Sequence, residues 1–197
     1  AIKVVIPDTL KITTPYWLKE KGTLGMYKVN DRKLIGKPET DRSLKAYFVL
    51  LIDDVTFEFE KPVVYKRNDP VKGEVYQPFE ILPKATVGIA EKVYIFPNSE
   101  SKDVVVKVKS GKNEISGTVS LDVPANWKVS PENYDVAIKQ KGAEQSLVFK
   151  VTPPKNQSEG DIKPVFKMDS KSFTDELIEI DYDHIPFQSV LMPSKSK

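Results

Sequence analysis

The feature of this sequence that most constrains its fold is a period-two alternation of apolar and polar side chains. It is clearest in residues 117–123, where Val119, Leu121 and Val123 alternate with polar neighbours. The same pattern recurs in residues 147–152 and 178–183. Alternation of this kind is typical of a β-strand with one covered face. The 15 prolines lie mostly between such runs, where they can end or edge a strand, and no long amphipathic helix pattern appears. The sequence therefore predicts an all-β protein.

The spacing of the alternating segments predicts two tandem immunoglobulin-like β-sandwich domains. The second half of the chain holds about seven short strand-like segments in about 100 residues, the number typical of that fold. The first half is less regular, with strands expected at residues 2–6, 46–52, 55–60, 62–65 and 79–82. Residues 46–52 are continuously apolar, which predicts burial on both faces, and Asp53-Asp54 predicts a hairpin turn after them. We expect a β-sandwich domain with aromatic loops over residues 1–84 and an immunoglobulin-like sandwich over 85–183. Residues 184–197 are then a C-terminal tail or the lead into a following domain.

Composition argues against several classes of function. The 30 Lys and Arg residues nearly balance the 28 Asp and Glu residues, so the net charge of +2 predicts no nucleic-acid binding. No segment has the roughly 20 apolar residues that a membrane-spanning helix needs. The chain has no cysteine, which removes disulfides and thiolate chemistry. Because the chain starts at Ala1 without an initiator methionine, we expect it to be part of a longer protein.

The titratable residues predict no catalytic residue, no metal site and no cofactor. His184 is the single histidine, and it could serve as a base or a ligand. Because no nucleophile stands near it in the sequence, we interpret it as a boundary residue at a strand end with an ordinary hydrogen bond. A calcium site built from carboxylates is the alternative, but none of the acidic pairs has the spacing of a defined calcium loop. We interpret them as solvated turn charges; the pairs are Asp53 with Asp54, Asp69 with Glu74, and Asp181 with Asp183.

Two loop segments, residues 13–27 and 65–78, are richer in aromatic residues than a plain sandwich requires. Three interpretations stay open: a packed loop over the end of a core, a protein interface, or an aromatic platform that stacks on a sugar ring. The candidate interface or carbohydrate contacts are Tyr16, Trp17, Tyr27, Tyr65, Arg67, Asp69 and Tyr76.

These segments resemble a known bacterial family. The motifs TTPYWL, GMY, LIGKPE and VVYKRNDPVKGEVYQP resemble a region that lies C-terminal to the catalytic domain of large LmbE-like (PIG-L-type) deacetylases. In the second half, VPANWKVSP and QSLVFKVTPP resemble the alpha-galactosidase-associated (NPCBM-associated) immunoglobulin-like domain. That family has glycine before the tryptophan, whereas Asn126 precedes Trp127 here. We expect Trp127 to be largely buried at the edge of the sandwich.

The resemblance implies a role without catalysis. The deacetylase family carries its metal ligands in an N-terminal domain whose motif is absent from this sequence, so no catalytic residue transfers. It implies a non-catalytic accessory or scaffold region of a larger N-acetylglucosaminyl deacetylase-type protein, periplasmic or secreted, that contacts neighbouring domains of the same polypeptide. Carbohydrate binding through exposed aromatic residues is the alternative.

Overall fold

The computed structural model describes residues 5, 7, 10–20, 22–185 and 187–197, so the strand predicted at residues 2–6 lies outside the described residues apart from Val5. The predicted all-β class is confirmed. The described residues contain 14 strands and one short 3-10 turn, η1 (Arg32–Leu34), and no α-helix. They fall into two compact units. Unit 1 comprises Ala1–Leu82 with Glu179–Val190, and unit 2 comprises Pro83–Ile178 with Leu191–Lys197.

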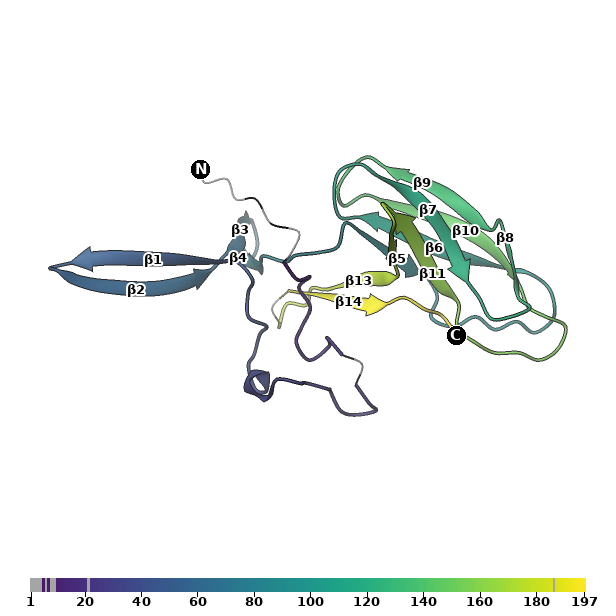
Figure 1. The fold of residues 1–197 in the computed structure, drawn as a ribbon, viewed down its shortest axis with the longest axis horizontal. Coiled ribbons are helices and arrows are strands. Elements are labelled where there is room, and N and C mark those ends of the chain that lie inside the picture. The colour runs from purple at the N-terminus through teal and green to yellow at the C-terminus, as the bar shows by residue number, and fades with distance from the viewer. Residues whose placement is uncertain (1–4, 6, 8–9, 21, 186) are drawn as a thin grey trace. The chain divides into compact units, whose positions relative to one another are not determined.

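Unit 2 is a β-sandwich of two four-stranded antiparallel sheets (Figure 1). The first sheet has the order β5 (Ala85–Ile89), β6 (Lys102–Ser110), β10 (Glu144–Thr152) and β8 (Lys128–Ser130). The second has the order β12 (Lys171–Phe173), β11 (Lys163–Met168), β7 (Ile115–Asp122) and β9 (Asn133–Ile138). The alternating residues read from the sequence form these strands because every second side chain points into the space between the sheets.

The core of unit 2 lies between the two sheets. Phe149 of the first sheet and Phe166 of the second are fully buried in one continuous cluster. Tyr134 closes that cluster with its ring edge toward Phe149, at a centroid distance of 5.0 Å, and its hydroxyl donates to the carbonyl of Val148 at 2.9 Å. The core is therefore closely packed with apolar side chains, and the tyrosine hydroxyl at its edge has a hydrogen-bond partner, as expected for a folded domain.

Two residues of unit 2 refine the sequence analysis. Trp127 is half-buried rather than largely buried, because one of its sides faces a cleft described below. Asn126 has φ of +68°. Asparagine tolerates this left-handed conformation better than most residues with a side chain, so it suits the turn before Trp127.

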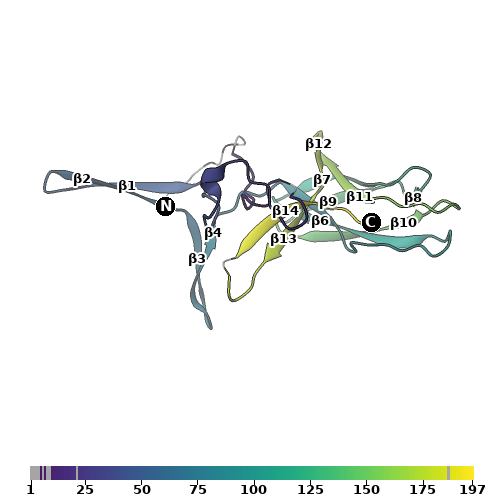
Figure 2. The same cartoon turned by 90° about the horizontal axis from the view of Figure 1, so that it is seen from below.

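Unit 1 contains two separate antiparallel ribbons (Figures 1 and 2). One pairs β1 (Lys45–Ile52) with β2 (Val55–Pro62), and the other pairs β3 (Val64–Asp69) with β4 (Gly73–Pro78). Asp53 and Asp54 form the predicted turn, both with positive φ, as in the two-residue turns that suit strand twist. These strands do not face each other as two sheets, so unit 1 differs from the expected sandwich. Residues 46–52 are also largely exposed, which corrects the expected burial on both faces.

Strands β13 (Asp175–Ile180) and β14 (Gln188–Pro193) pair in a further two-stranded sheet. The chain passes from unit 2 into unit 1 within β13 and returns within β14. The compact units therefore divide the chain differently from the predicted segments 85–183 and 184–197. The reason is strand pairing, which brings part of the expected tail back to unit 2, where the Ser194 amide donates to the Thr174 carbonyl at 2.9 Å.

Candidate functional site

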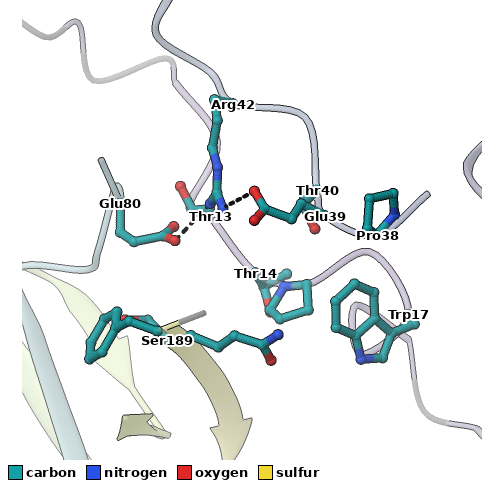
Figure 3. Close-up of a pocket in the computed structure, with 12 residues that line it drawn as sticks. Thr13, Thr14, Trp17, Pro38, Glu39, Thr40, Arg42, Glu80 and Ser189 are labelled. Atoms are coloured by element: carbon teal, nitrogen blue, oxygen red, sulfur yellow. Dashed lines mark hydrogen bonds and ion pairs between the residues drawn. The ribbon is translucent and has the colours of Figure 1, made fainter. Parts of the chain in front are cut away.

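A small pocket in unit 1 lies where three chain segments meet around Arg42 (Figure 3). Its cavity volume is about 60 Å³, enough for water but small for most ligands. The segments are residues 13–17, 38–42 and 187–189, and Glu80 completes the lining. The backbone joins two of these parts, because the Thr13 amide donates to the Ile81 carbonyl and the Ile81 amide donates to Thr13 Oγ1, both at 2.9 Å. Residues 79–82, predicted as a strand, are held by these bonds outside any strand.

Arg42 links the segments through charge (Figure 3). Its Nη1 donates to Glu80 Oε1 and its Nη2 donates to Glu39 Oε2, both at 2.9 Å. The side chains of Arg42 and Glu80 are only 14% and 11% exposed, so this pair is screened little by solvent. The planar guanidinium with its fixed fork of donors suits a bridge between two carboxylates.

Two oxygens that line this pocket have no hydrogen-bond partner among the described residues. They are Thr14 Oγ1 and Glu80 Oε2, and both are buried. A buried acceptor left unpaired costs free energy, so each calls for a small donor such as a water molecule in the pocket. The pocket offers a carboxylate, an arginine and a hydroxyl, and its hydrogen bonds join separate chain segments. We call this site the Arg42 junction.

The predicted contacts Tyr16 and Trp17 lie at this junction as a perpendicular pair. Their ring centroids are 4.9 Å apart and their planes make an angle of 89°. Tyr16 is committed to the loop beside it, because its amide donates to Thr40 Oγ1 and its hydroxyl donates to the Lys37 carbonyl, both at 3.0 Å. Both side chains are half-buried. The hydrogen bonds of Tyr16 and the small pocket beside it favour the packed-loop interpretation over a platform for sugar rings.

Tyr27 lies in a separate, shallower hollow that it shares with Trp17. Its side chain is exposed, and it follows a tight turn in which the Thr23 and Met26 backbones bond to each other. The structure therefore brings Tyr27 near Trp17 but does not include it in the Arg42 junction.

The remaining predicted contacts lie on the β3–β4 ribbon and divide between its two faces. Tyr65, Arg67 and Asp69 alternate on one face, and Tyr76 lies on the other, directly opposite Lys66. Lys66 Nζ lies 5.4 Å from the centre of the Tyr76 ring and 2.5 Å from Glu74 Oε1. The hydrogen bond from Lys66 holds the pKa of Glu74 below its ordinary value. Lys66, Glu74 and Tyr76 therefore interact with one another on the surface of the ribbon.

Three of the carboxylates considered for calcium, Asp69, Glu74 and Asp183, have other partners. Asp69 Oδ1 accepts from the amides of Val71 and Lys72, both at 2.9 Å, and Asp183 pairs with Lys72 at 2.5 Å. In the part of the chain that the structure describes, no group of three or more His, Cys, Asp or Glu side chains is placed to hold a metal ion. His184 stacks on Tyr182, with centroids 5.8 Å apart and planes at 21°.

Sequence reasoning missed the most distinctive surface of unit 1, the apolar face of the β1–β2 ribbon. This face consists of Phe48, Leu50, Ile52, Val55, Phe57 and Phe59, each 44–54% exposed. Phe48 and Phe59 stack across the strands, with centroids 5.5 Å apart. The opposite face mixes apolar residues of β1 with Thr56, Glu58 and Glu60 of β2. The signal was available in β2, whose apolar residues alternate with polar ones and so predict a single covered face.

Among the described residues, no helix is long and apolar enough to cross a membrane. A scan against protein-family models returned no match, and a search among curated proteins returned none either.

Proposed function

We propose that this chain is a non-catalytic accessory module that contacts neighbouring domains of a larger, exported LmbE-like deacetylase-type protein through the β1–β2 ribbon. The motif resemblance supports the enzyme context and the export. The observation that carries the contact function is the apolar face of the ribbon defined above, with six half-exposed side chains in register.

The physical argument starts from the instability of such a ribbon alone in water. A two-stranded hairpin is marginal unless another layer covers its hydrophobic face. The six side chains form one continuous patch of roughly several hundred Å², and patches of that size mark sites of interaction. No charged residue lies among the six positions, so a partner meets no desolvated charge on this face.

Two contacts between its own strands close the ribbon at its base. Lys45 Nζ and Glu60 Oε1 are 2.8 Å apart where β1 begins, and Val63 donates its amide to the Leu44 carbonyl at 3.0 Å. The Arg42 junction lies three residues before β1. A ribbon that is closed at its base and apolar on one face is suited to presenting a preformed surface to a partner.

Adjacent leucines of β1 provide a matched test. Leu50 lies on the apolar face and Leu51 lies on the opposite face. We expect the chain to bind the separately produced catalytic domain of the parent polypeptide, measured by calorimetry. Leu50→Asp should reduce that binding at least tenfold, because it buries an unpaired charge in the interface, whereas Leu51→Asp should leave it nearly unchanged. Absence of binding by the unmodified chain, or equal loss in both variants, would contradict the proposal.

Sugar binding through Tyr16 and Trp17 is the second candidate. The bonds of Tyr16 to residues 37–40 and the small volume of the pocket beside it, about 60 Å³, speak against it at that position.

A further inference from the structure

Unit 2 contains an open cleft of about 580 Å³ that the accessory role does not use. It is lined by two loops, residues 93–99 and 153–160, and by Trp127, Ile162 and Lys197. Its volume falls within the range of ordinary small-molecule sites. All of its lining belongs to the sandwich unit, so the cleft is independent of the β1–β2 ribbon.

The aromatic part of the cleft is fixed by the core. Tyr94, Phe96 and Trp127 pack against a buried cluster that contains Val104 and Val151. Phe96 and Trp127 meet edge to face, with centroids 5.0 Å apart and planes at 87°. Burial raises the pKa of Tyr94. These rings are therefore held in place before any ligand arrives, which lowers the entropic cost of binding.

The loop of residues 153–160 is held at two points against the turn of residues 124–127. The Trp127 indole N–H donates to Ser158 Oγ at 3.2 Å. Gly160 approaches Pro124 so closely that an added Cβ would lie 2.5 Å from the proline Cγ. The position of this loop is thus set by contacts within unit 2, and the polar side chains that it carries are presented at the cleft.

Those polar side chains are mainly neutral. The cleft lining includes Asn98, Ser99, Asn156, Gln157 and Ser158. Its charged lining residues are Lys155, Glu159 and Lys197; Lys197 Nζ and Glu159 Oε2 lie 3.6 Å apart and offset each other, which leaves Lys155 as a single positive charge. The cleft therefore has no cluster of basic groups for a phosphate or an acid. Amide and hydroxyl side chains both donate and accept, which matches a ligand rich in hydroxyl groups.

We propose that this cleft binds a neutral pyranose sugar. Such a ring has an apolar C–H face for the aromatic side chains and a border of hydroxyls for the amides at the rim. A proline-rich peptide is the competing occupant, because such peptides also bind aromatic-lined grooves. The sugar is favoured because the Trp127 indole N–H is committed to Ser158, and because the amides at the rim match hydroxyls better than proline rings.

The test uses the tryptophan as its own reporter. Trp17→Phe leaves Trp127 as the one remaining tryptophan, since the chain has two. The probes are maltotriose, cellotriose and triacetylchitotriose, titrated to roughly 10 mM while the fluorescence and the indole N–H resonance of Trp127 are followed. We expect saturable changes with at least one of them. Asn156→Ala and Gln157→Ala, which change exposed loop residues, should each weaken binding roughly twofold to tenfold.

Two controls make the result decisive. Lys107→Ala changes an exposed strand residue outside the cleft and should leave the sugar affinity unchanged. A proline-rich decapeptide is titrated in parallel. No saturable change with any sugar, saturation by the peptide alone, or unchanged affinity in both amide variants would overturn the proposal. The outcome is separate from the β1–β2 contact, because Leu50 and Leu51 lie in the other unit.

Discussion

The pairs β1–β2 and β6–β10 are both long antiparallel ribbons built from apolar residues, yet they end in opposite environments. In β6, Val104, Val106 and Val108 are fully buried, whereas in β1 the residues at comparable spacing, Phe48, Leu50 and Ile52, are half-exposed. The difference does not come from strand propensity, which is high in both. It comes from the second sheet of unit 2, which covers one face of β6–β10 and has no counterpart over β1–β2 among the described residues.

The comparison shows that an alternating sequence pattern predicts which strands form better than it predicts whether another layer packs on their apolar face. Alternation fixes which side chains share a face, because successive residues point to opposite sides. Covering depends on elements far away in the sequence. The β1–β2 face therefore has the composition of a core but, within this chain, the exposure of a surface, and this discrepancy is why we assign it to an interface.

The largest expected difference in stability is between two variants that each remove an aromatic ring, one from the β6–β10 pair and one from the β1–β2 ribbon. Phe149→Ala should lower the free energy of unfolding of unit 2 by about 3–5 kcal/mol, because the ring is fully buried and leaves a cavity. Phe57→Ala should change stability by no more than about 0.5 kcal/mol, because its ring is already half in water. Urea unfolding followed by circular dichroism measures both. Equal losses would show that something in the isolated chain already covers the ribbon.

Alanine substitutions at two strand glycines test how closely the strands of the sandwich pack. A Cβ on Gly117 would lie 2.2 Å from the Lys167 carbonyl oxygen and 2.8 Å from the Phe166 ring, neither of which can move freely. Gly117→Ala should therefore destabilise unit 2 by about 1–3 kcal/mol. Gly88→Ala is the matched control, since the added Cβ would meet only the flexible Glu176 side chain, at 3.3 Å and beyond. Thermal unfolding of the two variants should differ clearly, and equal midpoints would argue against the close contact at Gly117.

Variants at the Arg42 junction test whether its ion pairs stabilise the folded structure of unit 1. Arg42→Met leaves Glu80 without its partner in a largely buried position and should cost about 1–3 kcal/mol. Lys45→Met removes the more exposed ion pair with Glu60 and should change stability less than Arg42→Met, because solvent screens that pair. Hydrogen exchange at the Thr13 and Ile81 amides is the readout for unit 1. Unchanged exchange in Arg42→Met would mean that the backbone bonds alone hold the junction.

The sequence predicted the strands of unit 2 and their buried faces well, but it predicted the burial of the unit 1 strands poorly. Val119, Leu121 and Val151 alternate with polar neighbours, so local pattern alone predicts their strands and covered faces. For residues 46–52, the continuous apolar run predicted a strand correctly and burial wrongly, because local sequence carries no information about a covering layer. The Arg42–Glu80 pair joins residues 38 positions apart, and the Trp127 cleft joins loops nearly 60 positions apart. Neither leaves a periodic signal in the sequence.

The β3–β4 ribbon gives the smallest expected effect, a local dependence on pH at its turn. The amides of Lys72 and Val71 donate to Asp69 and hold the pKa of its carboxyl below the ordinary value of 3.8. A lowered pKa means that the folded turn favours the ionised carboxylate. The stabilisation is therefore fully present above the ordinary pKa, and it is lost as the pH falls through the lowered one.

Proton resonances of the Val71 and Lys72 amides report this titration directly. We expect both to shift with a common midpoint below 3.8 as Asp69 takes up a proton. Asp69→Asn keeps an oxygen acceptor for the two amides but removes the charge, so the amide shifts should lose this transition while the turn persists. Asp69→Ala removes the acceptor and should loosen the turn at every pH. A midpoint at or above the ordinary value would show that the carboxylate does not accept these bonds in solution, and the β3–β4 turn would then depend on its backbone pairing alone.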